Sequence, residues 1–247
     1  MFNEYELLDR YDAAARAGFE GVEIQAPYSE PIEAIQERLE RNRLKHVIIN
    51  LPVADPETGQ NNLPLQPDKV ALYQERVGLG VEYAAGLGCI GVNTGIGPLP
   101  QGEDLDTAYR TYIDNLRFAA SELQKVGVFA LIEPINTKDQ PGFLIHNSSQ
   151  GMKAIADADH PNAFLQYDFY HMQIMEGRLT ETFAELLPSI KHVQFADTPG
   201  RNEPGTGEIN YPFIFRKLDE LGYRGWAGAE YNPSGRTEDS LDWFHAL

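Results

Sequence analysis

Short apolar runs and longer amphipathic stretches alternate along most of the chain. The runs are rich in Val, Ile, Phe and Tyr, which is typical of buried parallel strands. They predict strands at residues 21–25, 46–51, 90–94, 128–133, 164–169, 192–196 and 226–230. The amphipathic stretches predict helices at residues 4–17, 31–42, 67–87, 104–126, 148–158, 180–187 and 211–221, and a last one from about residue 237.

Strict alternation of strands and helices predicts a parallel sheet with its helices outside. No linker or change of composition divides the 247 residues, so we expect a single domain at residues 1–247. Such a chain suits an α/β fold of the (β/α)8 TIM barrel type. However, the prediction contains one strand fewer than helices and begins with a helix. We therefore expect a barrel that lacks its usual first β-strand, with unpaired edges between the second and eighth strands.

Four of the predicted strands end in a side chain with an oxygen donor. These donors are Glu133 in LIEP, Asp168 in LQYD, Gln194 in HVQFAD and Glu230 in GAE. Their separations are 35, 26 and 36 residues, about one strand–helix unit each. Because the carboxyl ends of barrel strands open into one mouth, we expect the four side chains to converge.

Three converging carboxylates repel one another unless a cation or protonation compensates their charge. An all-oxygen ligand set favours Mg²⁺ or Mn²⁺ over Zn²⁺, which prefers nitrogen and sulfur. The sequence therefore predicts a divalent metal site formed by Glu133, Asp168, Gln194 and Glu230. For any one of these acids, a rim salt bridge or a helix cap is the better interpretation. For four donors in register, a shared metal site is the better interpretation.

Composition narrows the classes of partner. The formal net charge is -17, whereas binding of nucleic acid needs clustered Lys and Arg, so we expect neither nucleic acid nor an anionic membrane as a partner. No signal peptide and no apolar run of about 20 residues is visible, which makes a cytoplasmic location the expectation. The motifs of serine hydrolases and Rossmann dehydrogenases are missing, and the single cysteine, Cys89, excludes an intrachain disulfide.

Polar residues near the strand ends add candidates for substrate binding. His171, three residues after Asp168, could contact a substrate oxygen or orient a carboxylate; the alternative is a solvated loop histidine. Arg201 lies in the loop after the seventh strand and could anchor an anionic substrate, because guanidinium groups match carboxylates; the alternative is a surface arginine. Asn50, which ends the third strand, and Glu23, inside the second, could line the mouth or form hydrogen bonds in the core.

The segments around the four donors resemble hydroxypyruvate isomerase, in the xylose isomerase-like TIM-barrel superfamily. The resemblance covers nearly the whole chain, and the long loop motif is its most specific part. Related sugar isomerases and 3-epimerases share the four-ligand arrangement but usually have His where this chain has Gln194. The segments are LIEPIN (131–136), QYDFYHMQIMEG (166–177), HVQFADTPGRNEPGTGEINY (192–211) and GAEYNP (228–233).

This resemblance implies a reaction. A metal ion that chelates the carbonyl and hydroxyl oxygens of a small hydroxy-oxo acid would acidify the α C–H bond and stabilise a cis-enediolate. Glu133 and Glu230 would be the two acid/base groups. Arg201 and His171 would hold the substrate carboxylate or hydroxyl. Hydroxypyruvate would then become tartronate semialdehyde.

Other functions remain open at this stage. One is isomerisation of a longer acid such as 2-oxotetronate, or 3-epimerisation of a ketose. Another is a non-catalytic ligand-binding homologue, although the intact acids Glu133 and Glu230 count against it. Nuclease activity is not expected, because it would need several histidine ligands and a basic groove, whereas the chain has six histidines and a net charge of -17. An open barrel edge and an apolar, aromatic C-terminal helix (Leu241, Trp243, Phe244) permit a homo-oligomer.

Overall fold

Short parallel strands form the inner wall of the molecule in the computed structural model, which describes residues 1–246. The strands are β1 (Gly21–Val22), β2 (Lys45–His46), β3 (Ile48–Asn50), β4 (Gly91–Asn93), β5 (Phe129–Ile132), β6 (Ala163–Asp168), β7 (Ile190–Phe195) and β8 (Ala227–Ala229). β1 pairs with β2, and β3 to β8 pair in sequence order. Val47 joins these two groups, because its N–H donates to the carbonyl of Val22 (2.8 Å) and its carbonyl accepts from the N–H of Ile90 (2.9 Å). β2 and β3 therefore act as one barrel strand, as the predicted run at residues 46–51 indicates.

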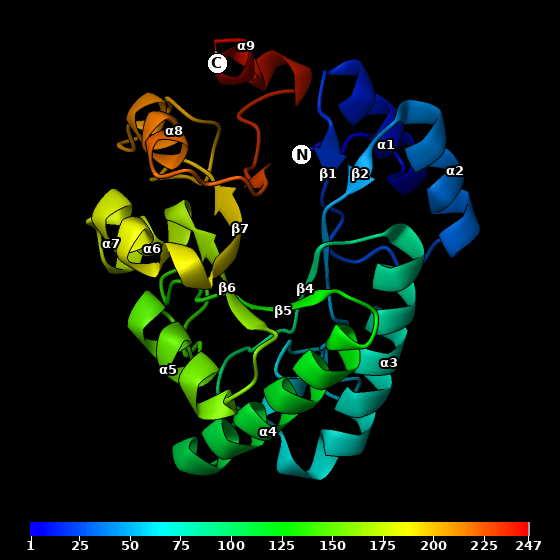
Figure 1. Cartoon of the computed structure of the whole chain (residues 1–247), viewed down its shortest axis with the longest axis vertical. Helices are drawn as coiled ribbons and strands as arrows, with labels where there is room; N and C mark the ends of the chain where they lie inside the picture. Colours follow the sequence, from blue (N-terminus) through cyan, green and yellow to red (C-terminus); the bar gives the residue numbers. More distant parts are fainter. Residues whose placement is uncertain (247) are drawn as a thin grey trace.

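Helices cover the outer face of this wall (Figure 1). Helix α4 shows how the sequence places them. Asp104 accepts a hydrogen bond from the backbone N–H of Thr107 (3.0 Å) and so caps the first turn, while buried residues recur every three or four positions. The helices are α1 (Leu7–Arg16), α2 (Ile32–Asn42), α3 (Val70–Leu87), α4 (Leu105–Gln124), α5 (Ser148–Ala158), α6 (Phe169–Met175), α7 (Leu179–Leu186), α8 (Tyr211–Glu220) and α9 (Asp242–His245).

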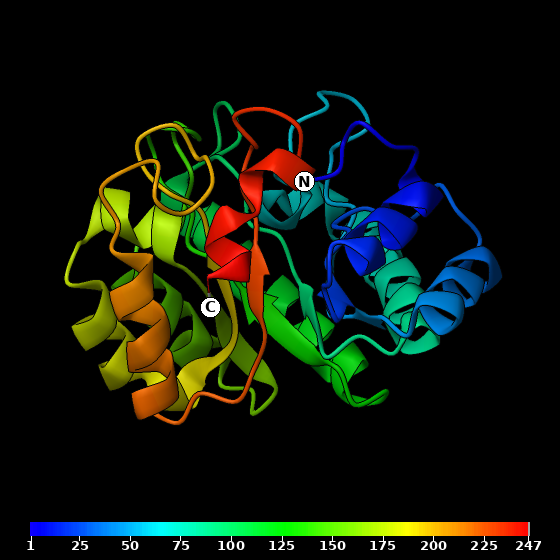
Figure 2. The same cartoon turned by 90° about the horizontal axis from the view of Figure 1, so that it is seen from above.

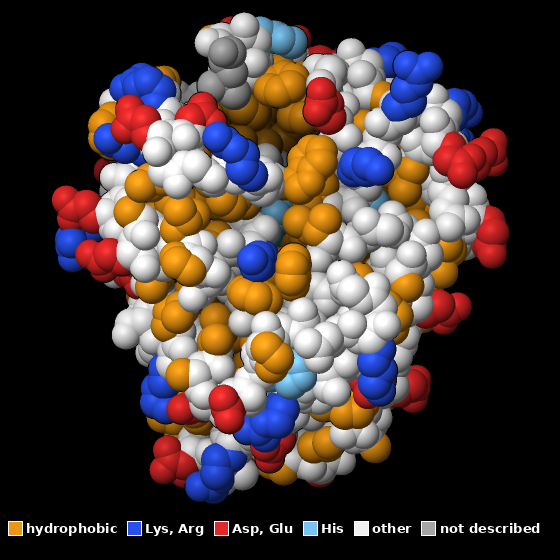
Figure 3. All heavy atoms as spheres, viewed as in Figure 1, with side chains coloured by type: hydrophobic (Ala, Val, Ile, Leu, Met, Phe, Trp, Pro, Cys, Tyr) orange, Lys and Arg blue, Asp and Glu red, His pale blue; other side chains and the backbone are white. Residues whose placement is uncertain are grey.

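The barrel is open between β1 and β8. No pairing joins these two strands within residues 1–246, and a cavity of about 1010 Å³ lies between them. In Figure 2, β8 (orange) and β1 (blue) face each other across this gap, and Figure 3 shows apolar side chains around the hollow. The open α/β barrel that the strand count predicts, with an unpaired edge on each side of the gap, is thus confirmed.

The C-terminal aromatic residues pack within this chain, along the same gap. Phe244 stacks on Phe19, with ring centroids 4.6 Å apart, and Trp243 packs edge-on against Phe195 at 5.2 Å. These contacts tie α9 to the segment between α1 and β1 and to the end of β7. Trp243 and Phe244 therefore pack within the chain, at least in part, instead of facing a second subunit. A homo-oligomer stays a prediction.

One helix has no counterpart among the predicted elements. The residues after Asp168 form the short helix α6, and Asp168 caps it by accepting from the backbone N–H of Tyr170 (2.7 Å). The side chains of Phe169 and Met172 are buried against α7 and β7, so burial favours a helix in a segment that shows no helical pattern long enough to predict one. Separately, none of the helices in residues 1–246 is long and apolar enough to cross a membrane.

Loops at the carboxyl ends of β3 and β4 pack tightly against each other, and a glycine allows it. Gly97 has φ +106°, and a Cβ there would overlap the carbonyl oxygen of Asn61.

Gly97→Ala is therefore expected to lower the free energy of unfolding by about 3 kcal/mol or more, through backbone strain and steric overlap. Gly102→Ala is the matched control. Gly102 also has a positive φ, but a Cβ there would meet no atom within 4 Å, so it should cost only about 1 kcal/mol. Urea unfolding of both variants measures the difference, and equal losses would contradict this account.

Candidate active site

The four predicted oxygen donors lie at one end of the barrel. Asp168 is the last residue of β6 and pairs in register with Gln194 of β7. Glu133 directly follows β5, and Glu230 directly follows β8. Since all these strands are parallel, the four side chains project from the carboxyl ends of four successive strands into the same mouth.

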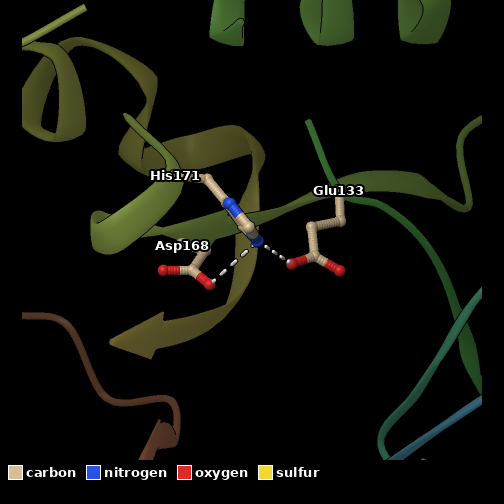
Figure 4. Close-up of side chains that lie close together, drawn as sticks. All are labelled: Glu133, Asp168 and His171. Atoms are coloured by element: carbon tan, nitrogen blue, oxygen red, sulfur yellow. Dashed lines mark ion pairs between the residues drawn. The ribbon is translucent and has the colours of Figure 1, made fainter. Parts of the chain in front are cut away.

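Two of the carboxylates meet around a histidine (Figure 4). The Nε2 atom of His171 lies 3.7 Å from Oε1 of Glu133 and 3.6 Å from Oδ2 of Asp168. All three side chains are buried. Among the acidic, histidine and cysteine side chains that the structure describes, these three form the group whose potential ligand atoms all lie within 4.8 Å of one another.

The other two donors connect to this group through intermediate side chains. Gln194 accepts a hydrogen bond from Gln166, whose side-chain oxygen in turn lies 3.4 Å from Nδ2 of Asn93. Asn93 Nδ2 also donates to Glu133 (2.7 Å). On the other side, an NH2 nitrogen of Arg201 lies 3.1 Å from Oε2 of Glu230 and 3.9 Å from Oδ2 of Asp168. The four predicted donors thus share one network without all touching one another.

The chemistry of this donor set fits a divalent cation. Oδ2 of Asp168 is fully enclosed and has no hydrogen-bond partner, which is costly for a buried carboxylate oxygen. Burial, followed by the charges of Glu230 and Asp168, raises the pKa of Glu133 well above its usual value. Burial also raises the pKa of Asp168 to about 6, against the opposing effect of Arg201. A hard cation bound by these oxygens would give Oδ2 of Asp168 a partner and would offset the cost of burying the charged carboxylates.

Hydrogen bonds from Asn136 fix which nitrogen of His171 faces the acids. The Oδ1 atom of Asn136 accepts from the backbone N–H groups of Lys138 (3.1 Å) and Asp139 (2.8 Å), so its Nδ2 must face Nδ1 of His171, 2.7 Å away. Nδ1 of His171 is therefore an acceptor, and the proton of the neutral ring is on Nε2. Burial, reinforced by Arg201, lowers the pKa of His171 to about 3, so the ring is neutral. His171 thus presents an N–H donor to the site, and the alternative of a solvated loop histidine is wrong.

Arg201 is held over the site by a tightly organised loop. The buried carboxylate of Asp197 accepts from four backbone N–H groups of that loop, those of Thr198, Gly205, Gly207 and Ile209. The guanidinium of Arg201 lies over the ring of Tyr170, 5.2 Å from its centroid. Only about a quarter of the Arg201 side chain is exposed, which distinguishes it from an ordinary surface arginine.

The side chain of Asn50 has no described contact with this group. It ends β3 and pairs in register with Asn93, but no described contact links its side chain to the acids. The Oδ1 atom of Asn50 is enclosed and has no hydrogen-bond partner among the described residues. Its predicted role in substrate binding therefore stays a prediction.

Several amides that donate to the predicted ligands are not among the predicted site residues. Asn93 donates to Glu133, Gln166 to Gln194, and Gln25 to Glu230. For Gln166 a signal existed, because it lies two positions before Asp168 and so faces the same side of the strand. Gln25 approaches from across the open gap, and Asn136 approaches from a loop; neither position can be inferred from strand periodicity.

Comparison with known proteins now decides the family. The sequence model described as "Xylose isomerase-like TIM barrel" matches residues 11–247. Hydroxypyruvate isomerase of Escherichia coli (strain K12) is 41% identical over 243 residues, which are 98% of this chain and 94% of that protein. The chain belongs to the xylose isomerase-like TIM barrel family.

Other relatives of this xylose isomerase-like barrel carry related names. The 2-oxo-tetronate isomerase of Pectobacterium atrosepticum is 40% identical, covering 98% of this chain and 93% of that protein. A solved structure described as AP endonuclease, family 2, from Brucella melitensis is 37% identical with a TM-score of 0.96, covering 100% and 95% of the two chains. D-allulose 3-epimerase from Methylomonas sp. is 20% identical with a TM-score of 0.77, covering 97% and 83%, and shares the fold. The expected isomerase-like enzyme class is confirmed by the curated relatives.

Asp168→Asn is expected to stabilise this xylose isomerase-like barrel at pH 7 in the presence of a chelator. The folded protein keeps the proton of Asp168 up to about pH 6, whereas the unfolded chain releases it near pH 4. Stability therefore falls as the pH rises through this window, by about 3 kcal/mol for two pKa units. The asparagine can still accept from the N–H of Tyr170 but carries no charge.

Urea unfolding at pH 4 and pH 7 measures this effect. Between these pH values, wild type should lose about 2–3 kcal/mol more stability than Asp168→Asn. Asp114→Asn, at a mostly exposed position on α4, is the charge-matched control and should follow wild type. The same pH dependence in wild type and Asp168→Asn would show that burial does not perturb this carboxyl group.

Proposed function

We propose that this protein is a divalent-metal-dependent isomerase that interconverts hydroxypyruvate and tartronate semialdehyde. One observation carries the proposal: a partly buried arginine, Arg201, lies beside the carboxylates of Glu230 and Asp168. A substrate held there would have its carboxylate next to the atoms that must exchange protons. The relatives named hydroxypyruvate isomerase and 2-oxo-tetronate isomerase support a substrate of this class.

The proposed cation is Mg²⁺ or Mn²⁺, held by Glu133, Asp168, Gln194 and Glu230. When bound, it would draw electron density from the substrate carbonyl and so acidify the neighbouring C–H bond. The orphaned Oδ2 atom of Asp168 and the raised pKa values of Glu133 and Asp168 support this assignment.

The protein's own groups would move the protons. One of the two acids, Glu133 or Glu230, removes a proton from C3 of hydroxypyruvate, and the other delivers one to C2. The hydroxyl proton passes from O3 to O2, so that the alcohol and the carbonyl exchange places and no atom is gained or lost. Arg201 pairs with the substrate carboxylate, and the Nε2–H of His171 donates to a substrate oxygen.

Three alternative functions differ in the support they have. Isomerisation of 2-oxotetronate uses the same carboxylate and carbonyl, and several relatives carry that name. Ketose 3-epimerisation is less supported, because those structures share only the fold at 20% identity and a ketose has no carboxylate for Arg201. A nuclease is disfavoured by the net charge of -17, in spite of the name given to the Brucella melitensis structure.

Proton NMR of hydroxypyruvate in D₂O, with Mn²⁺ or Mg²⁺ and the protein, tests the proposal. Tartronate semialdehyde should form and deuterium should enter at carbon, because the exchanged protons pass through carboxyl groups. Glu133→Gln should reduce the rate by about 10²- to 10⁴-fold, since it removes one acid/base group. Asp114→Asn is the control and should keep full activity.

The outcomes separate the alternatives. Turnover of 2-oxotetronate but not of hydroxypyruvate would assign the longer acid as substrate. No product and no deuterium incorporation with either acid would overturn the proposal. Full activity in Glu133→Gln would overturn the role given to that residue.

A further inference from the structure

Glu23 lies beneath the proposed metal site and contacts β7 from across the open gap. It follows β1, yet its Oε2 accepts a hydrogen bond from Nε2 of Gln194 (2.9 Å) and its Oε1 lies 2.7 Å from Nε2 of His192. Only 14% of the Glu23 side chain is exposed. Both of its oxygens thus face β7, so Glu23 is occupied beneath the site rather than available as a fifth ligand.

A glycine makes this reach possible. Gly228 of β8 pairs in register with Gln194, and a Cβ at Gly228 would overlap the carboxylate of Glu23. The carboxylate of Glu23 therefore occupies the space that a side chain on β8 would take. Since β8 and β1 are not paired, this carboxylate bridges the two edges of the barrel directly below the four donors.

The amide of Gln194 needs such a partner if it is to bind a cation. An amide carries an acceptor oxygen and a donor nitrogen on the same group, and a rotation of 180° about its last bond exchanges them. A cation must meet the oxygen. The carboxylate of Glu23 can only accept from Nε2 of Gln194, so it selects one orientation of this amide. The hydrogen bond that Gln166 donates to Oε1 of Gln194 from the other side agrees with that orientation.

We propose that Glu23 is a positioning residue that fixes the side-chain amide of Gln194 with its oxygen toward the metal position. The proposal rests on the proposed function, because it takes Gln194 as a metal ligand. The negative charge of Glu23 also polarises the amide, which makes the oxygen of Gln194 a stronger ligand. The three acids attract a cation through their own negative charge. Gln194 is the uncharged member of the proposed ligand set, and Glu23 favours cation binding by the oxygen of this amide.

Titration of Mn²⁺ into the purified protein tests this, with free Mn²⁺ followed by its EPR signal and without any substrate. Glu23→Gln is expected to weaken Mn²⁺ binding about 10- to 100-fold, the usual effect of losing a partner behind a metal ligand. Glu20→Gln is the control, because it removes the same charge from an exposed position at the start of β1 and should bind Mn²⁺ like wild type.

A double-mutant cycle shows whether Glu23 acts through Gln194. Gln194→Ala should itself weaken binding, and adding Glu23→Gln to it should weaken binding no further. If the two losses multiply instead, Glu23 affects the ion independently of Gln194, through direct electrostatic attraction or through general structure, and the proposal is overturned. If Glu23→Gln alone binds Mn²⁺ as tightly as wild type, it is overturned as well.

Two further results keep the outcome unambiguous. Circular dichroism shows whether Glu23→Gln folds. If it does not, Gly228→Ala takes its place in the experiment. The added methyl group would displace the Glu23 carboxylate, while every proposed ligand stays in the sequence. It should weaken Mn²⁺ binding to a similar extent, and unchanged binding would contradict the proposal. Two other results are that wild type binds no Mn²⁺, or that it binds Mn²⁺ that Asp168→Asn leaves in place. Either result would overturn the metal site of the proposed function, and the role of Glu23 with it.

Discussion

Concentration of negative charge in a buried place is the constraint on which this active site depends. The carboxylates of Glu133 and Asp168 are almost fully enclosed at the carboxyl end of the barrel, and Glu230 joins them from β8. In a low dielectric such a group is costly unless positive charge or protons compensate it. The structure supplies one fixed compensating charge, Arg201, which lies close to Asp168 and Glu230. In the proposed function, a bound divalent cation would supply the rest.

The surrounding polar residues orient the acids of this cluster and the side chains beside them. The amides of Asn93, Gln166 and Gln25 each donate to one of the proposed ligands. Further out, the buried carboxylate of Asp197 organises the loop that carries Arg201, and Asn136 sets the tautomer of His171. The site thus consists of acids that the barrel strands place and of amides and loops that orient them.

Much of this arrangement follows from sequence periodicity, and the rest does not. Parallel strands that end in Glu133, Asp168, Gln194 and Glu230 place these residues at one rim, because strand spacing and the barrel's geometry leave little freedom. The gap beside β1 follows from counting strands. By contrast, the helix at residues 169–175 has no counterpart among the predicted elements, because it is short and depends on burial of Phe169 and Met172 against the rest of the molecule. The contacts of Gln25 and Glu23 across the gap depend on tertiary distances that no local pattern records.

A crystal structure with Mn²⁺, using its anomalous scattering, tests the central claim most directly. The account predicts one ion bound by an oxygen of each of Glu133, Asp168, Gln194 and Glu230, at about 2.0–2.2 Å, with Arg201 moved away from Glu230. The nitrogen of His171 should stay outside the coordination sphere, because its Nε2 carries a proton. An ion held by Glu133, Asp168 and Nε2 of His171, with Gln194 and Glu230 unbound, would contradict the account.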